Sequence, residues 1–428
     1  MHRTLIAGAV AAACATPAAF AQSAVSIGGA LSVTYGTAKA TGGTGGSAQD
    51  MQSHDRVRDG TDSYIRISVT EDLGGGNSAF VQVESAVLGN ADTRNNAFGA
   101  GAVSAGWSTK NSAIGIRSKS AGRFLIGVWD LHYNEMDGID PSRQLTTAST
   151  STLAMSQNFG SAFSINPAIG TRYSNVLRWD SPVWSGFSAT LGYARPTDGA
   201  PLNAAGDVRD GRKNRAWHLA ARYESGNIQV RYAYLHDKDA VTNATISFGG
   251  ATGAFLGAGT ISAAWKITSN RLGVRYRFAN GLGAGVIWDS SKVSNTTAVA
   301  AASIGIKRDV WAIPITYESG SHYFFAAYAR AGDWRGRIGG LGVGAVTNPA
   351  IGTQPLGTLN FGSESGAKFI SLGYGYKLSQ RSILYVTYQR ITNDALARYD
   401  TYSNTTDTTA ANVGADPSLL QFGMRHTF

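Results

Sequence analysis

Apolar and polar residues alternate with a period of two in many short segments of the chain. In segment 272–278 every second residue is apolar or aromatic, from Leu272 to Phe278, and the residues between them are one glycine and two arginines. Segment 418–428 repeats this arrangement up to the last residue, Phe428. A period of two is typical of a β-strand whose two faces meet different surroundings. The pattern predicts an all-β chain.

The connections between these segments are of two kinds. Sixteen strands are predicted, at 24–39, 63–73, 78–84, 112–117, 123–128, 172–181, 187–194, 216–224, 228–235, 271–278, 282–289, 310–318, 323–329, 369–378, 382–390 and 418–428. Seven connections are tight and rich in Gly, Asn and Ser, as hairpin turns require. The other eight are long and polar, at 40–61, 87–109, 129–171, 196–213, 238–264, 291–307, 331–365 and 392–415. This sorting predicts a transmembrane antiparallel β-barrel of 16 strands, with short periplasmic turns and long extracellular loops.

The polar faces of the strands indicate what the barrel encloses. Period alone does not separate a membrane barrel from a soluble barrel or sandwich. Sixteen strands make a barrel too wide for glycine and arginine side chains to fill, so the polar faces predict a lumen that holds water. Aromatic residues near strand ends fit the interfacial girdles of such barrels: Trp179, Trp217, Trp265, Trp288, Trp311, Tyr376 and Phe428.

The first residues have the features of a secretory signal. Arg3 is followed by an apolar run, and Ala19-Phe20-Ala21 offers the small residues that signal peptidase needs. We expect cleavage after Ala21, which leaves 22–428 as a single barrel domain. Cys14, the only cysteine, offers a lipidation site as the alternative, although Ala11 stands where a larger apolar residue is preferred.

The composition narrows the function classes further. The chain has 53 glycines, 15% charged residues and a mean hydropathy of −0.11, and beyond the signal no run of 18 apolar residues, which excludes a helical membrane protein. Without cysteine in the mature part and with seven scattered histidines, we expect no disulfide, metal or cofactor. The formal net charge is +9, but the cations stand singly along the chain, so we expect no nucleic-acid partner.

Four segments resemble the general diffusion porins of the outer membrane of β-proteobacteria, which belong to the Gram-negative porins. They are 70–84, 172–187, 372–385 and 422–428, and they include Thr70-Glu71-Asp72-Leu73-Gly74, Arg172-Tyr173-Ser174-Asn175 and Leu372-Gly373-Tyr374-Gly375-Tyr376. The resemblance implies a homotrimer of sixteen-stranded barrels, a location in the bacterial outer membrane after export through the periplasm, and a third loop, 129–171, folded into the lumen. It also implies that the terminal residues are an assembly signal, namely Phe428, Met424 and Phe422.

The chain departs from this family at three positions where the porins commonly carry arginine. Tyr64 and Asn111 occupy two positions that face the narrowest section, and Val128 occupies the third. Arg66 lies two residues from Tyr64 on the same face and is the candidate replacement.

The candidate pore constriction combines the start of the third loop with the lumen face of the strands. The loop opens with four acids, Asp130, Glu135, Asp137 and Asp140. The alternation along the strands places Glu84 and nine arginines on the face that we expect to line the lumen. The arginines are at 66, 117, 172, 178, 222, 231, 271, 275 and 277. From these we assign to the constriction Arg66, Glu84, Arg172, Arg178, Arg231 and Arg275, with the four loop acids.

We expect the arginines to oppose the acids across the gap and to impose a transverse field on permeating solutes. The sequence predicts passive transport of small hydrophilic solutes and ions. Because the arginines assigned to the lumen outnumber the acids there, we expect this transport to show a weak anion preference. The alternatives are a substrate-specific porin for a small anionic or sugar solute and a barrel-anchored binding or adhesion protein. An outer-wall lipase would need a histidine near a serine on the outer face, and His218 has lumen parity, so we expect no enzyme. The expected partners are outer-membrane lipid, two further copies of the chain and the solutes in transit.

Overall fold

The computed structural model describes most of the strands and part of the connections. The described residues are 24–43, 51–59, 63–87, 108, 110–140, 152, 155–156, 163–164, 172–195, 215–239, 247–248, 265–295, 303–339, 345–348, 352–355, 360–395, 397, 399 and 414–428. The expected signal, 1–21, lies outside them, as does much of the third loop beyond Asp140.

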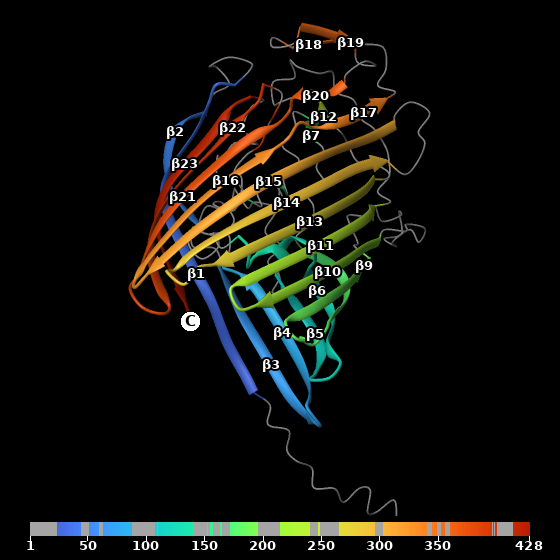
Figure 1. Cartoon of the computed structure of the whole chain (residues 1–428), viewed down its shortest axis with the longest axis vertical. Helices are drawn as coiled ribbons and strands as arrows, with labels where there is room; N and C mark the ends of the chain where they lie inside the picture. Colours follow the sequence, from blue (N-terminus) through green and yellow to red (C-terminus); the bar gives the residue numbers. More distant parts are fainter. Residues whose placement is uncertain are drawn as a thin grey trace, which may run out of the picture.

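Sixteen strands form one closed antiparallel barrel, which confirms the predicted fold (Figure 1). They are β1 (Ala24–Thr41), β3 (Tyr64–Gly74), β4 (Asn77–Ala86), β5 (Ser112–Ser118), β6 (Gly122–Asp130), β8 (Arg172–Asp180), β9 (Phe187–Ala194), β10 (Arg215–Ser225), β11 (Ile228–Asp239), β13 (Trp265–Arg277), β14 (Leu282–Asn295), β15 (Ser303–Ser319), β16 (His322–Ala331), β21 (Ala367–Lys377), β22 (Ser382–Asn393) and β23 (Asp416–Thr427). Each strand pairs with the next one in the chain, and β1 closes the barrel by pairing with β23. We call the end with the short connections the turn rim and the other end the loop rim.

The seam of the barrel is joined at the last residue of the chain. The Gly29 N–H donates to the Phe428 carbonyl at 2.9 Å, and the Phe428 N–H donates to the Gly29 carbonyl at 3.0 Å. A side chain at position 29 would stand 2.7 Å from Cζ of the Phe428 ring and would also collide with the Tyr64 carbonyl. Met424 and Phe422, the other two residues of the expected assembly signal, point outward from β23 and are exposed.

The outer and inner walls of the barrel differ as the alternation predicts. Large apolar side chains point outward and are exposed, for example Ile114 at 60% and Ile126 at 59%. A sheet face that exposes such side chains around its circumference matches a lipid environment. Inward-facing positions carry polar and small side chains, among them Arg178, Arg271, Ser269 and Ala233, which are buried. None of the described residues forms a helix long and apolar enough to cross a membrane.

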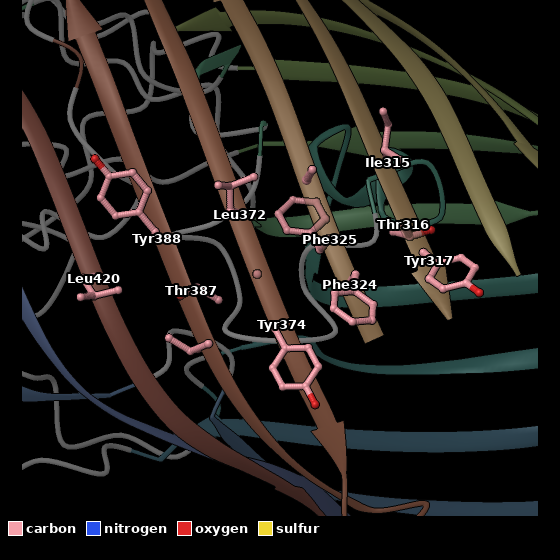
Figure 2. Close-up of a pocket in the computed structure, with 13 residues that line it drawn as sticks. Ile315, Thr316, Tyr317, Phe324, Phe325, Leu372, Tyr374, Thr387, Tyr388 and Leu420 are labelled. Atoms are coloured by element: carbon pink, nitrogen blue, oxygen red, sulfur yellow. The ribbon is translucent and has the colours of Figure 1, made fainter. Parts of the chain in front are cut away.

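A hollow of about 410 Å³ lies on the outer wall over β15, β16, β21 and β22 (Figure 2). It exists because Ala326, a small residue, stands between Ile315 and Leu372 on the neighbouring strands. Its rim consists of exposed Phe324 and Tyr388, both of which point outward. The hollow is therefore part of the lipid-facing surface and not of the lumen.

The structure adds strands inside segments that the alternation assigns to loops. These are β2 (Met51–Asp59), β7 (Phe163–Ser164), β12 (Ser247–Phe248), β17 (Arg335–Gly339), β18 (Ala345–Asn348), β19 (Gly352–Pro355) and β20 (Asn360–Glu364). β2 pairs with β1, and β17 pairs with β15 and β20, so they extend the barrel wall at the loop rim. The backbone ladder continues there although the sequence has no regular apolar alternation.

The lumen wall carries an apolar patch as well as polar groups. A buried cluster joins Met136 and Ile139 of the third loop to inward residues of the strands, among them Ala233, Ile287 and Ala312. Glycines make room for this contact, since a side chain at Gly273 would stand 2.9 Å from Sδ of Met136. The start of the third loop therefore packs inside the barrel, as the resemblance implies.

Candidate functional site

The third loop begins with a short 3-10 turn, η3 (Tyr133–Met136), that points one carboxylate at the barrel wall. Glu135 is 3% exposed, and its Oε1 lies 3.1 Å from Nη2 of Arg178 on β8. Nε of Arg222 on β10 donates to Oε2 at 2.9 Å, and Nε2 of His218 lies 3.3 Å from Oε1. We call these four residues, Glu135, Arg178, His218 and Arg222, the Glu135 cluster.

Glu135 remains ionised in this cluster. Burial alone raises the pKa of its carboxyl, but the hydrogen bond from His218 and the charges of Arg178 and Arg222 outweigh burial and hold the pKa well below its usual range. The carboxylate is thus a permanent anchor for the loop at neutral pH.

Arginines of the wall also hold the backbone of the loop. Nη1 of Arg178 donates to the Asp130 carbonyl at 2.9 Å, and Nη1 of Arg231 on β11 donates to the Glu135 carbonyl at 3.2 Å. Nη1 of Arg275 on β13 donates to the Gly138 carbonyl at 3.2 Å. Side chains from four strands therefore fix residues 131–140, which we call the docked loop.

A second group of polar side chains lies at the start of the docked loop. Nε of Arg172 is 3.2 Å from Oδ1 of Asp130, and Nδ2 of Asn111 donates to Oδ2 of Asp130 at 2.7 Å. The Asn111 Oδ1 accepts in turn from Nε of Arg172 at 3.1 Å and from the Asp130 N–H at 3.0 Å. Asn111, where the general porins have arginine, therefore joins an arginine to Asp130. Asp130 is the last residue of β6 and not, as expected, part of the third loop, because it still pairs with Arg172 on β8.

A third pair stands on the neighbouring strands β3 and β4. Nη2 of Arg66 lies 2.6 Å from Oε2 of Glu84, and the two residues are directly opposite in the strand register. The guanidinium of Arg66 lies 5.0 Å from the centre of the Tyr64 ring, and Nζ of Lys110 lies 5.2 Å from it. A cation over an aromatic face is a favourable contact. Tyr64, the other position where arginine is usual, is therefore covered by two cations.

The remaining two loop acids have other surroundings. Asp140 is buried, and its Oδ2 accepts from the Thr152 N–H at 2.9 Å and from Oγ1 of Thr152 at 2.6 Å, so it ties two parts of the third loop together. Asp137 ends η3, where its N–H donates to the Asn134 carbonyl at 3.2 Å.

The arrangement differs from the expectation of arginines and acids that face each other across the gap. Glu84, Asp130 and Glu135 each touch an arginine directly. The physical reason is that the loop folds onto the basic wall, where a direct ion pair is shorter and stronger than an interaction across water. The loop acids therefore neutralise part of the wall instead of opposing it.

The described residues contain no group of three or more His, Cys, Asp or Glu that could hold a metal ion. His218, the histidine considered for an outer-wall lipase, points into the lumen, with Nδ1 at 3.1 Å from the Tyr234 carbonyl and Nε2 on Glu135. It is thus part of the loop anchor.

Solved structures of porins have the same fold as this chain. The anion-selective porin from Comamonas acidovorans aligns with a TM-score of 0.67 and 17% identity, over 95% of this chain and 100% of that one. OmpT of Vibrio cholerae in its trimer form aligns at 0.59 with 14% identity, over 95% of this chain and 99% of that one. Salmonella typhi OmpF, in a complex with daunomycin, aligns at 0.53 with 13% identity, over 94% of this chain and 97% of that one. No curated protein sequence matches the chain.

A model of the Gram-negative porin family matches residues 7–396, which is most of the chain. The chain belongs to the Gram-negative porin family. This confirms the family suggested by the four segments, and it places the protein in the outer membrane as a diffusion porin.

Several residues that hold the docked loop of this porin cannot be recognised from the sequence as partners of the loop. Arg222 and His218 have lumen parity, but nothing local connects them with Glu135, which lies more than eighty positions earlier in the chain. Asn111 is notable in the sequence only as a departure from the family. Asp180 accepts from Nε of Arg178 at 2.9 Å, and nothing in the sequence indicates this contact. These partners are fixed by the path of the loop.

His132 gives the docked loop of this porin a predicted dependence on pH. Burial lowers its pKa well below 6.5, and the charges of Arg271 and His218 add to this effect, while Glu135 opposes it. The docked loop therefore binds fewer protons than the released loop, and docking weakens as pH falls below about 6.5, by about 1.4 kcal/mol per pH unit at most. Glu135 acts in the same direction at lower pH, from its ordinary pKa of about 4.5 down to its lowered pKa.

The matching variant is His132→Asn. Asparagine tolerates the positive φ of 64° at this position and does not titrate. In planar bilayers we expect wild-type channels to become noisier between pH 6.5 and 5, and the variant to stay unchanged over this range. The same noise in both proteins would show that His132 is not the responsible group.

Proposed function

We propose that this porin is a passive channel for small hydrophilic solutes with a weak preference for anions. The observation that carries the preference is the charge balance on the wall. In the Glu135 cluster and the adjoining Asp180, two carboxylates meet three guanidinium groups, of Arg123, Arg178 and Arg222, and an imidazole. Among the described residues, Arg275 makes its side-chain hydrogen bonds only to neutral groups, the Gly138 carbonyl and Oγ1 of Thr316. A lumen with an excess of fixed positive charge favours anions.

The name of one structural neighbour, an anion-selective porin, agrees with this proposal. The trimer form of another supports a homotrimer for this chain. We further propose that 1–21 is removed on export and that the channel has no enzymatic activity. The histidine considered for an outer-wall lipase, His218, lies against Glu135 in the lumen.

The test is the reversal potential in a KCl gradient across a planar bilayer. We expect the sign that reports anion flux in the wild type. Arg275→Gln should move the potential toward zero, and Arg275→Lys, which keeps the charge, should keep the wild-type value. A cation-favouring sign in the wild type, or equal effects of the two variants, would contradict the proposal.

A further inference from the structure

Two methionines of the third loop pack against the inner wall of the barrel. After the expected signal the chain has four methionines, and Met136 and Met155 are the two in this loop. Both side chains are 0% exposed, and both belong to the buried apolar cluster that joins the loop to the strands. Met424 differs from them, since it points outward on β23 and is exposed. The loop methionines therefore contribute apolar packing to the attachment of the loop.

The sulfur of Met136 lies in a space that exists because the wall has glycine there. A Cβ atom added at Gly273 on β13 would stand 2.9 Å from Sδ of Met136 and 3.0 Å from Cγ1 of Ile139. A Cβ atom added at Gly285 on β14 would stand 3.4 Å from Cγ2 of Ile139. Protein interiors that are packed this closely do not accept a further heavy atom without displacement.

Met136 is also central to the backbone of the docked loop. It is the last residue of η3, and its carbonyl accepts from the Ile139 N–H at 2.8 Å and from the Asp140 N–H at 3.0 Å. The residue before it, Glu135, carries the carboxylate of the Glu135 cluster. A displacement of Met136 therefore disturbs the same turn that presents Glu135 to the wall.

The sulfur of methionine has a reaction that the neighbouring aliphatic side chains lack. Hydrogen peroxide, a small neutral solute, enters a water-filled lumen and transfers one oxygen atom to a thioether. The O–O bond breaks and an S–O bond forms, and the sulfur loses two electrons to the peroxide, which leaves as water. Because the docked sulfur of Met136 is 0% exposed, the reaction takes place while the loop is released.

The sulfoxide does not fit the docked position of the thioether. Its oxygen is an additional heavy atom at the sulfur, and it makes an apolar side chain polar. The cluster that receives the two methionines consists of hydrophobic side chains. Burying a polar group among such side chains is unfavourable unless it gains a hydrogen bond. Oxidation should therefore shift the equilibrium between docked and released loop toward release, on the order of ten-fold or more.

We propose that Met136 and Met155 are oxidation sites at which peroxide loosens the third loop of this porin. The docked loop protects both sulfur atoms, and an oxygen atom gained during a brief release hinders the return of the loop. Oxidised channels are then noisier and conduct more than reduced ones, and exposure to peroxide is recorded as a change of the pore.

The test treats the folded porin with hydrogen peroxide and examines each protein before and after the treatment. Mass spectrometry of peptides measures the sulfoxide at each methionine, and limited proteolysis and single-channel recording measure docking. In the variant Met136→Leu/Met155→Leu, side chains of similar volume that peroxide does not oxidise replace the two thioethers. The matched control is Met424→Leu, which removes the exposed thioether of the outer wall.

We expect peroxide to make the channels of the wild type and of Met424→Leu noisier and more conductive. Cleavage in the third loop should become about ten-fold faster or more, in proportion to the sulfoxide at 136 and 155. The double variant should behave in the same way before and after the treatment, so that oxidation of other residues is excluded as the cause.

Three results would overturn the proposal. The first is sulfoxide at both loop methionines of the wild type with unchanged conductance and cleavage. The second is the absence of sulfoxide at both positions after a treatment that oxidises them in the unfolded chain. The third is a response of the double variant equal to that of the wild type. The first two are measured on the wild type alone, so they decide the question even if the double variant fails to fold.

Discussion

Glu135→Gln is expected to release the docked loop and to give channels with higher conductance and a stronger anion preference. The variant leaves Arg178, whose side chain is 6% exposed, without the carboxylate at 3.1 Å, and it leaves Arg222 without its partner. Removing one member of a buried ion pair is destabilising, and because Arg178 keeps Asp180 at 2.8 Å the cost here is expected at the lower end of the usual range, about 3 kcal/mol. Because Arg222 is 34% exposed, we assign most of this effect to Arg178.

Single-channel recording and limited proteolysis of the folded protein measure this effect. The matched control is Glu224→Gln, which removes the same charge from the pair with Arg231 at a site where the carboxylate side chain is 46% exposed. The control should keep the conductance and the protease resistance of the wild type. The same result for Glu135→Gln would mean that the carboxylate does not hold the loop.

Gly29→Val is expected to prevent closure of the barrel. The added side chain would meet the backbone carbonyl of Tyr64, which cannot move without opening the pairing of β1 with β3, and also the ring of Phe428, 2.7 Å from Cβ. Overpacking usually costs about 1–3 kcal/mol, and the cost rises when backbone must shift. An open seam also leaves backbone groups unpaired in lipid, which the membrane does not tolerate.

The measurement is the yield of folded barrel after expression or refolding in detergent, read from its altered mobility without boiling. Gly305→Val is the control, since a side chain there meets nothing within 4 Å and the residue also lies in a strand. We expect folded Gly305→Val and little folded Gly29→Val. A wild-type yield of Gly29→Val would show that the contact at the seam does not limit closure.

The sequence predicts the membrane-spanning part of the fold well because lipid acts on every strand in the same way. On β13, Leu272, Val274 and Tyr276 face outward and are exposed, as the alternation indicates. The limits of the strands are less predictable. β15 begins at Ser303 and not at Val310, because the part of the strand around Lys307 lies above the apolar band and has lost its pattern.

The alternation along the strands also identifies which residues face the lumen, but it does not identify the residues that they contact. It places Arg178 and Arg231 on the inner wall, where the structure has them. It does not reveal that Glu135 folds back onto them, because the path of a loop is set by long-range contacts and leaves no local period. For the same reason the roles of Asn111 and His218, which bind Asp130 and Glu135, can be recognised only from the folded structure.

A disulfide between the docked loop and β13 shows directly whether the loop lies against this strand inside the barrel. In the wild type, a Cβ atom added at position 273 would stand 2.9 Å from Sδ of Met136. In the variant Met136→Cys/Gly273→Cys the methionine is gone, so there is room for the new side chain at 273. The expected mature chain has no other cysteine. We expect mild oxidation to join the two residues, and the oxidised and reduced channels to have the same conductance. Failure to cross-link in the folded protein, or a conductance that changes when the bond forms, would contradict this position of the loop.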